Sequence, residues 1–314
     1  MRIVTIGLVC VALAGRCLLA DPLNGKRVSA QARWVAHLNL EQLNKSGIGS
    51  LLFLALATEK GKQRLGEFRE EFGFDPLTDL RSVTVYGKGP RDEDAVALFR
   101  GVFDGDRLVA LARASDSYEQ SGHHDQTIHG WVAVTRGRRE LSYGCLAADD
   151  TVVVSRSPAM VKEALDVLAR RKANITSVAG LADLLPRQPT ALLVVMADLE
   201  NLEHVSPNAT VLRSARNVRF SLTGDLERIS ASLALTATGE ATATHLHGAI
   251  GGLISLMALN AQENPELRIL TQALRVSRHG TSLRVELACP ARQALDLLKA
   301  GITKAKALHE ANQR

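Results

Sequence analysis

Histidine side chains gather in one stretch of the chain, where His123, His124, Asp125 and His129 fall within seven residues. Imidazole nitrogens and a carboxylate at this density are ligands that zinc and copper accept. However, His129 lies beyond Asp125 on a segment that reads as extended, which separates the two by roughly 13 Å. The same limit of reach applies to Glu119. We therefore expect an exposed polar loop and assign no metal ligand, and keep a metal-dependent hydrolase using His123, His124 and His129 as an alternative.

Signatures of nucleophilic and phosphate chemistry are missing from the sequence. No G-x-S-x-G elbow exposes a serine, and no G-x-x-x-x-G-K-[ST] loop cradles a phosphate. Residues 46–50 hold two glycines of a dinucleotide-binding fingerprint but lack the third. The acidic pairs at 92–94 and 149–150 fall in predicted turns, where turn chemistry accounts for them. We therefore predict no catalytic residue, no cofactor and no enzymatic activity.

Residues 1–20 differ in composition from the rest of the chain. Arg2 is followed by an apolar run over residues 3–15, and Ala20 ends the segment. A basic start, a short apolar run and a small residue before the cut are typical of a secretory signal peptide, and the run is shorter than a membrane span of about 20 residues. We predict export to the periplasm or secretion, with cleavage after Ala20. The alternatives are an earlier cut at 12–14 and an uncleaved anchor in the membrane.

The charge balance argues against a nucleic-acid partner. The full chain has 38 basic and 33 acidic residues, and removal of residues 1–20 takes away two arginines and no acid, which leaves a net charge of +3. Such a small excess does not favour nucleic acid, so the basic clusters at 136–139 and 170–172 are expected to be solvated surface. The remaining cysteines, Cys145 and Cys289, are expected to be separately buried thiols, with a single bridge between them as the alternative.

The elements that must position these side chains alternate between strand and helix. Asn39 is a suitable N-cap after an apolar strand, and Gly73 fits the C-terminal cap of a long helix over 51–72. Pro158 opens a further helix that runs to about Arg171. The strand-like segments are 33–38, 82–86, 95–103, 127–134, 140–146 and 151–155. Their polar turns and short spacing favour antiparallel pairs.

The second half of the chain repeats the order of elements in the first. Residues 35–43 match 194–202 at an offset of 159. Residues 82–85 match 217–220 at an offset of 135, so one deletion about as long as the helix over 51–72 accounts for the difference. This pattern predicts an internal duplication.

The duplication sets the expected architecture. We predict a signal peptide at 1–20 followed by two tandem related units, 21–180 and 181–314. The fold class is α+β, and each unit is a mostly antiparallel sheet with helices packed on one face. The interface between the units is the expected binding pocket.

The segment over residues 73–83, Gly-Phe-Asp-Pro-Leu-Thr-Asp-Leu-Arg-Ser-Val, follows the first capped Leu-Glu-x-Leu turn. With the signal peptide and the two α+β halves, it resembles uncharacterised exported bacterial proteins. The resemblance covers the whole mature chain and implies an exported protein with no named activity.

One apolar stretch, 243–259, needs a partner surface because it carries no charged residue and is interrupted by three glycines. Its own sheet is the first candidate, then the other half or a second chain, then an apolar ligand. We therefore expect a non-enzymatic binding or scaffold protein with an unknown macromolecular partner outside the cytoplasm. A carrier of a small apolar ligand is the alternative from another class.

Overall fold

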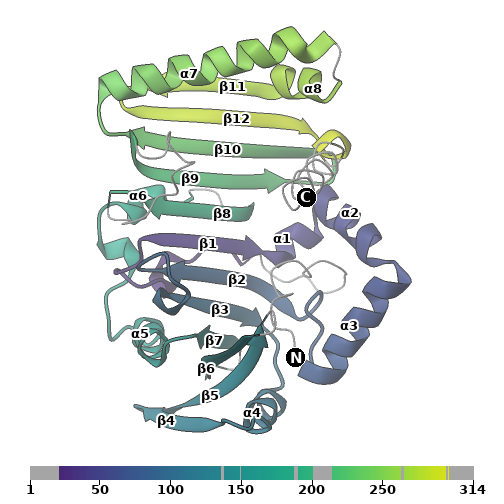
Figure 1. Ribbon diagram of the computed structural model, residues 1–314, viewed down its shortest axis with the longest axis vertical. Coiled ribbons are helices and arrows are strands. Elements are labelled where there is room, and N and C mark those ends of the chain that lie inside the picture. Colours follow the sequence, from purple (N-terminus) through teal and green to yellow (C-terminus); the bar gives the residue numbers. More distant parts are fainter. Residues whose placement is uncertain are drawn as a thin grey trace.

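One antiparallel sheet of 12 strands runs through the molecule, in the order β11-β12-β10-β9-β8-β1-β2-β3-β7-β6-β5-β4 (Figure 1). The computed structural model describes residues 21–135, 138–148, 150–186, 190–200, 214–262, 265–294 and 296. The strands are β1 (Trp34–Asn39), β2 (Leu80–Gly87), β3 (Ala95–Gly101), β4 (Glu119–His123), β5 (Gln126–Thr135), β6 (Arg138–Ala148), β7 (Thr151–Ser155), β8 (Ala191–Asp198), β9 (Ala215–Gly224), β10 (Arg228–Ala237), β11 (Leu274–His279) and β12 (Ser282–Pro290). The predicted α+β class with an antiparallel sheet is confirmed.

The described helices fall between the strands. They are α1 (Leu40–Asn44), α2 (Gly47–Leu56), α3 (Glu59–Phe72), α4 (Gly105–Arg113), α5 (Pro158–Leu168), α6 (Leu181–Leu184), α7 (Glu240–Leu259) and α8 (Pro265–Ala273). Three predicted helix boundaries are confirmed: Asn39 caps α1, Gly73 ends α3 with a φ of 75°, and Pro158 opens α5.

The single long helix predicted over 51–72 is wrong. The segment divides into α2 and α3, because the Thr58 side chain accepts a hydrogen bond from the Gly61 backbone N–H at 3.2 Å and begins a new helix there. A threonine side chain that satisfies an N-terminal N–H stabilises such a start.

The two halves of the chain share this one sheet, so they are not separate lobes. Their junction is the antiparallel pair β1 and β8, in which Val35 lies opposite Met196 and His37 opposite Val194. Outward from this junction the first half follows the order β1-β2-β3-β7-β6 and the second half the order β8-β9-β10-β12-β11. This shared order is the one that a duplication requires, and the relatedness of the halves stays a prediction.

Helices cover both faces of the sheet, which differs from the expectation of one covered face. Neighbouring residues on a strand point to opposite faces, and on β3 Leu98 joins the core beneath α5 while Phe99 packs against the core beneath α1. In the second half α7 packs over a third group of buried residues that includes Leu235 and Leu283. Because side chains alternate between the two faces of the sheet, both faces carry apolar residues on which helices pack.

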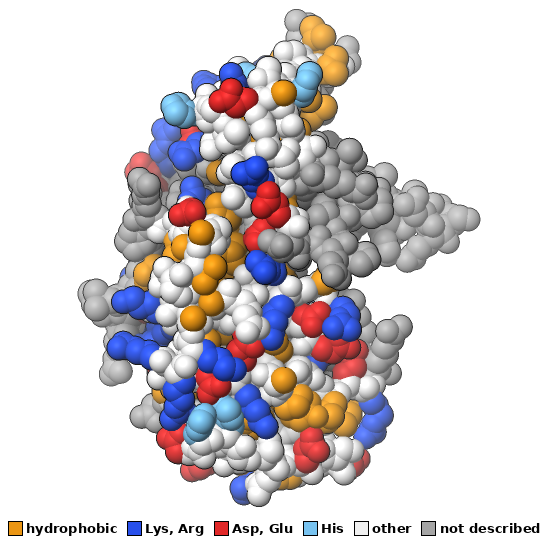
Figure 2. Space-filling model, turned by 90° about the vertical axis from the view of Figure 1, so that its left-hand side faces the viewer, with side chains coloured by type: hydrophobic (Ala, Val, Ile, Leu, Met, Phe, Trp, Pro, Cys, Tyr) orange, Lys and Arg blue, Asp and Glu red, His pale blue; other side chains and the backbone are white. Residues whose placement is uncertain are grey.

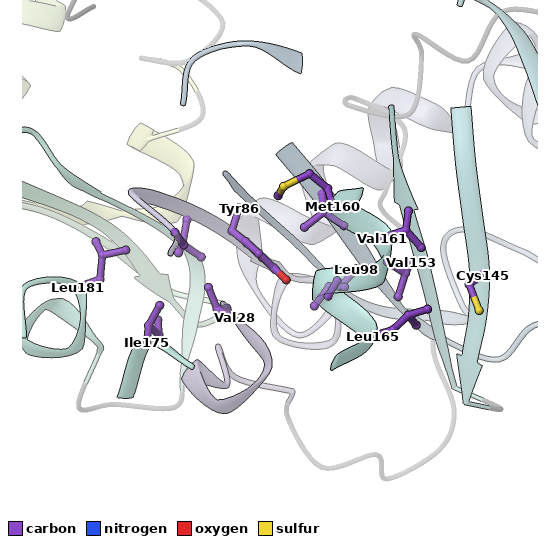
Figure 3. Packing of buried hydrophobic residues seen from close by; sticks show 14 of the residues in the cluster. Val28, Tyr86, Leu98, Cys145, Val153, Met160, Val161, Leu165, Ile175 and Leu181 are labelled. Carbon is purple, nitrogen blue, oxygen red and sulfur yellow. The ribbon is translucent and has the colours of Figure 1, made fainter. Parts of the chain in front are cut away.

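Helix α5 is fixed on its face by an apolar stripe. Met160, Val161 and Leu165 pack against strand residues that include Tyr86 and Val153 (Figure 3). Met160 and Val161 are adjacent and Leu165 follows Val161 by four residues, which places all three on one face of the helix. The helix and the strands beneath it therefore form one packed body.

Helix α7 lies along the far edge of the sheet, beside β11 (Figure 1). Ala243 and Leu246 are buried, but Leu253, Leu256 and Leu259 are 60–76% exposed. Figure 2 shows hydrophobic side chains gathered at this end of the molecule. By length and composition α7 could cross a membrane, and 11% of its most apolar window is buried inside the protein. Core helices of other proteins meet the same criterion, so this finding alone assigns no membrane span.

Candidate metal centre

The histidine segment is a β-hairpin, and the exposed loop that we expected is limited to its turn, His124 and Asp125. Strand β4 ends at His123, which lies opposite Gln126 on β5, and His124 and Asp125 form the turn between them. His124 has a φ of 53°, in the left-handed region, which histidine adopts more readily than most residues. Neighbouring side chains on an extended strand point to opposite sides. The left-handed turn instead brings the two imidazole rings together, with centroids 4.3 Å apart.

The third member of the site comes from α5. Asp166 is 8% exposed although it stands in the apolar helix between Leu165 and Val167. Its Oδ1 atom lies 2.9 Å from Nε2 of His123 and 3.2 Å from Nε2 of His124. The hairpin therefore packs against the helix through one carboxylate oxygen and two imidazole nitrogens.

These three atoms form a candidate metal centre. One ligand atom from each of His123, His124 and Asp166 lies within 4.8 Å of the others. Ligands about 2.1 Å from one zinc ion can be at most about 4.2 Å apart, so the set is within a small side-chain adjustment of coordination. Two imidazoles and one carboxylate are a zinc-binding combination, and three protein ligands leave a coordination position open.

The charges around Asp166 favour its ionised form. Burial alone raises the pKa of this carboxyl, but the hydrogen bond and charge of His123 and the neighbouring Lys172 ammonium outweigh burial, so the pKa lies below its ordinary value. Nζ of Lys172 lies 3.4 Å from Oδ2 of Asp166. An ionised carboxylate is the form that binds a metal ion.

Access to the centre differs between the two histidines. The His123 side chain is 18% exposed, and the His124 side chain is 46% exposed. Figure 2 shows histidine side chains beside acidic and basic ones toward the lower end of the molecule, where the first half of the sheet lies. The centre is thus supported by packed elements on one side and reaches solvent through His124.

Other residues of the predicted cluster do not join the centre. Nδ1 of His129 lies 2.9 Å from the hydroxyl of Tyr118, and the Asp125 side chain is 80% exposed. Glu119 stands at the opposite end of β4 from His123, with its side chain beside Gly130 and Tyr143. The prediction that His129 and Glu119 lie too far along the strands to join His123 and His124 was correct. It did not consider a ligand from another element, which Asp166 of α5 provides.

Sequence reasoning missed Asp166. The residue lies 42 and 43 positions from the two histidines, so no local spacing connects them. A signal was present, because a carboxylate in the apolar stretch of α5 needs a buried partner. The structure supplies two imidazoles and an ammonium as those partners.

The cysteines take the form that the sequence predicts. Cys145 and Cys289 are both buried and free. Burial raises the pKa of the Cys145 thiol to about 11, and its Sγ atom lies 3.3 Å from Oε1 of Gln126. A thiol with so high a pKa is a poor nucleophile.

A hollow of about 400 Å³ lies on the second half of the sheet. Its lining is mixed and includes Asn217, Arg219, His279, Arg284 and Glu286, together with Asp183 and Leu184 of α6. The hollow is therefore formed within one half, whereas we expected a pocket between the halves.

Comparisons with known proteins find distant structural likeness only. No family model and no curated protein matches the chain. Three solved structures, crystal forms III, IV and I of TP0453, are each 12% identical in sequence, with TM-scores of 0.49, 0.46 and 0.44. The matches cover 91%, 89% and 90% of this chain and 100%, 97% and 98% of those chains. Similarity at this level carries no conclusion about function.

Proposed function

We propose that the protein is an exported, non-enzymatic binding protein that holds a divalent transition-metal ion at His123, His124 and Asp166. The observation that carries this proposal is the convergence of Nε2 of both histidines on one oxygen of Asp166. The combination of two nitrogens and one oxygen favours zinc, with copper as the second choice. The ion would connect the β4–β5 hairpin to α5.

Export stays part of the proposal, and the fold is compatible with the proposed cut after Ala20. The Asp21 carboxylate accepts hydrogen bonds from Ser82 and from Arg100, and its side chain is 14% exposed. Because Asp21 directly follows the predicted cut after Ala20, this cut would leave the anchored residue in place. The proposed location is the periplasm or the exterior, with a membrane anchor as the alternative, and a macromolecular partner there stays part of the proposal.

The internal duplication also remains a proposal, with units at 21–180 and 181–314. It is supported by the strand order that the two halves share. If the strand order in one half had differed from that in the other, this support would be lost.

Zinc titration tests the metal proposal. The purified protein is titrated with zinc against a chromophoric chelator, and about one ion should bind per chain. His123→Ala, His124→Ala and Asp166→Asn should each weaken binding by at least about tenfold. His129→Ala and His279→Ala are matched controls, because both histidines lie outside the centre. Equal binding by the centre variants and the controls would contradict the proposal.

A metal-dependent hydrolase is the second candidate. It is favoured by one observation, since the exposed His124 edge and a three-ligand set resemble zinc sites that keep a position for water. Hydrolysis of a nitrophenyl ester or phosphate by the zinc-loaded protein, lost in Asp166→Asn, would support this candidate. Zinc binding without such turnover would favour the binding protein.

A further inference from the structure

The basic run at residues 170–172 lies at the candidate metal centre, although the sequence suggested only a solvated helix end. Helix α5 ends at Leu168, and Arg170 has a φ of 59°, which reverses the chain. The backbone N–H groups of Arg171 and Lys172 then donate to the carbonyl oxygen of Asp166 at 2.7 and 3.2 Å. The run therefore folds back onto the residue whose side chain meets the two histidines.

Both basic side chains keep much of their surface in water. Lys172 is 51% exposed, with Nζ 3.4 Å from Oδ2 of Asp166. Arg171 is 46% exposed, and its Nη2 atom lies 3.8 Å from Oδ1 of Asp125, beyond hydrogen-bond distance. Arg171 can therefore turn toward a ligand at the centre without losing a hydrogen bond to Asp125, whereas Lys172 is already held beside the centre by its contact with Asp166.

A bound metal ion would change the net charge of the centre. A divalent ion, Arg171 and Lys172 together exceed the two carboxylates of Asp125 and Asp166, so the loaded centre is formally positive. An ion held by three protein ligands would keep a coordination position that could accept an anionic oxygen, and the exposed His124 leaves the centre open to solvent. The guanidinium group of Arg171 and the ammonium group of Lys172 are suited to bind the remaining oxygens of a phosphate group.

We propose that the metal-loaded centre binds a phosphate group, with one oxygen on the ion and others on Arg171 and Lys172. This inference rests on the proposed metal function. The ligand could be inorganic phosphate or a phosphomonoester, since both present the same oxygens. Without the ion, the two carboxylates beside the cations would oppose the anion, so binding should depend on the metal.

The experiment uses the full protein loaded with one equivalent of zinc and titrated calorimetrically with inorganic phosphate, and separately with glycerol 3-phosphate. The same titrations are made on the zinc-free protein. In the cobalt-loaded protein, either ligand should also change the visible absorption spectrum, because it enters the coordination sphere. A response to both ligands identifies the phosphate group as the recognised part, and a response to one identifies its source.

Variants separate the ligand from the ion. Arg171→Gln and Lys172→Gln should each weaken phosphate binding by about five- to tenfold while zinc affinity stays equal or rises, because a cation beside the ion is removed. Lys62→Gln and Arg216→Gln are matched controls, since these exposed basic residues pair with carboxylates elsewhere. The controls should bind phosphate as the unchanged protein does.

The outcomes distinguish the two proposals. If zinc binds but phosphate binds no more tightly than to the zinc-free protein, the phosphate inference is overturned and the metal function stands. Phosphate binding that Arg171→Gln and Lys172→Gln leave unchanged overturns it as well. If zinc does not bind at all, the metal function fails first, and the phosphate site fails with it.

Discussion

At the scale of single residues, His37 shows how burial sets a titration. Its side chain is 2% exposed at the centre of the sheet, with Nδ1 2.9 Å from Oγ1 of Thr84 and Nε2 3.1 Å from the carbonyl oxygen of Asp21. Burial lowers the pKa of His37 to about 4, below the ordinary value of 6.5. The folded protein thus keeps this imidazole neutral where the unfolded chain would protonate it.

This shift predicts a loss of stability on acidification. The contribution of His37 is fully present above pH 6.5 and is lost as the pH falls toward 4, because the unfolded chain binds the proton more readily. The loss should approach about 3 kcal/mol. Urea unfolding between pH 7.5 and 4.5 measures it.

A variant comparison isolates this residue. Between pH 6.5 and 5, His37→Gln should flatten the pH dependence, whereas His279→Gln, which changes an exposed histidine, should not. Should His37→Gln fail to fold, NMR titration of the unchanged protein replaces it. An imidazole of His37 that titrates near 6.5 in the folded state would contradict the prediction.

At the scale of elements, α7 (Glu240–Leu259) is packed on the sheet near its start and exposed toward its end. Leu246 is 9% exposed and packs with Leu235 and Leu283, whereas Leu253 is 63% exposed. A Cβ placed on Gly248 or Gly252 would meet no atom within 4 Å, so the side of the helix that carries these glycines borders open space. Leu246 and Leu253 are seven positions apart and so lie on the same side of the helix, which means that the expected contact with the sheet holds for the first part of α7 and ends before Leu253.

Leucine truncation tests this difference. Leu246→Ala should lower the free energy of unfolding by about 2–4 kcal/mol, because it leaves a cavity in the core. Leu253→Ala should change it by less than about 0.5 kcal/mol. Urea unfolding of both variants gives the comparison. A large loss in Leu253→Ala would mean that the end of α7 around Leu253 is covered in solution.

At the scale of the whole molecule, the junction of β1 and β8 holds the two halves together. Val35 and Met196 lie opposite each other there, and both are 0% exposed. A chain cut between residues 180 and 181 would expose both strands as sheet edges, which favour pairing with another strand. We expect the pieces 21–180 and 181–314 to copurify when produced together and to aggregate when produced alone. Two soluble, folded, separate pieces would contradict this.

Much of the architecture could be predicted from local patterns. Asn39, Gly73 and Pro158 act within one helical turn, so their spacing was sufficient to place helix ends. The polar turns and short spacing between the strand-like segments also indicated antiparallel pairing. Local pattern could not show that β1 pairs with β8, because strands from the two halves can pair at several edges.

The candidate site depended on long-range packing and on one unusual backbone angle. His124 turns its ring toward His123 only because its φ is 53°, and no sequence pattern fixed that value. Asp166 joins them because α5 packs under the same part of the sheet. The residue types were readable from the sequence, but their convergence required the tertiary structure.

Strand β4 closes the sheet at its outer end, and its backbone has a neighbour on one side only. The proposed ion would link the turn between β4 and β5 to α5, which is packed in the core. Fraying of the outermost strand would then require release of the metal, so supply of the ion would govern how often this end of the molecule opens.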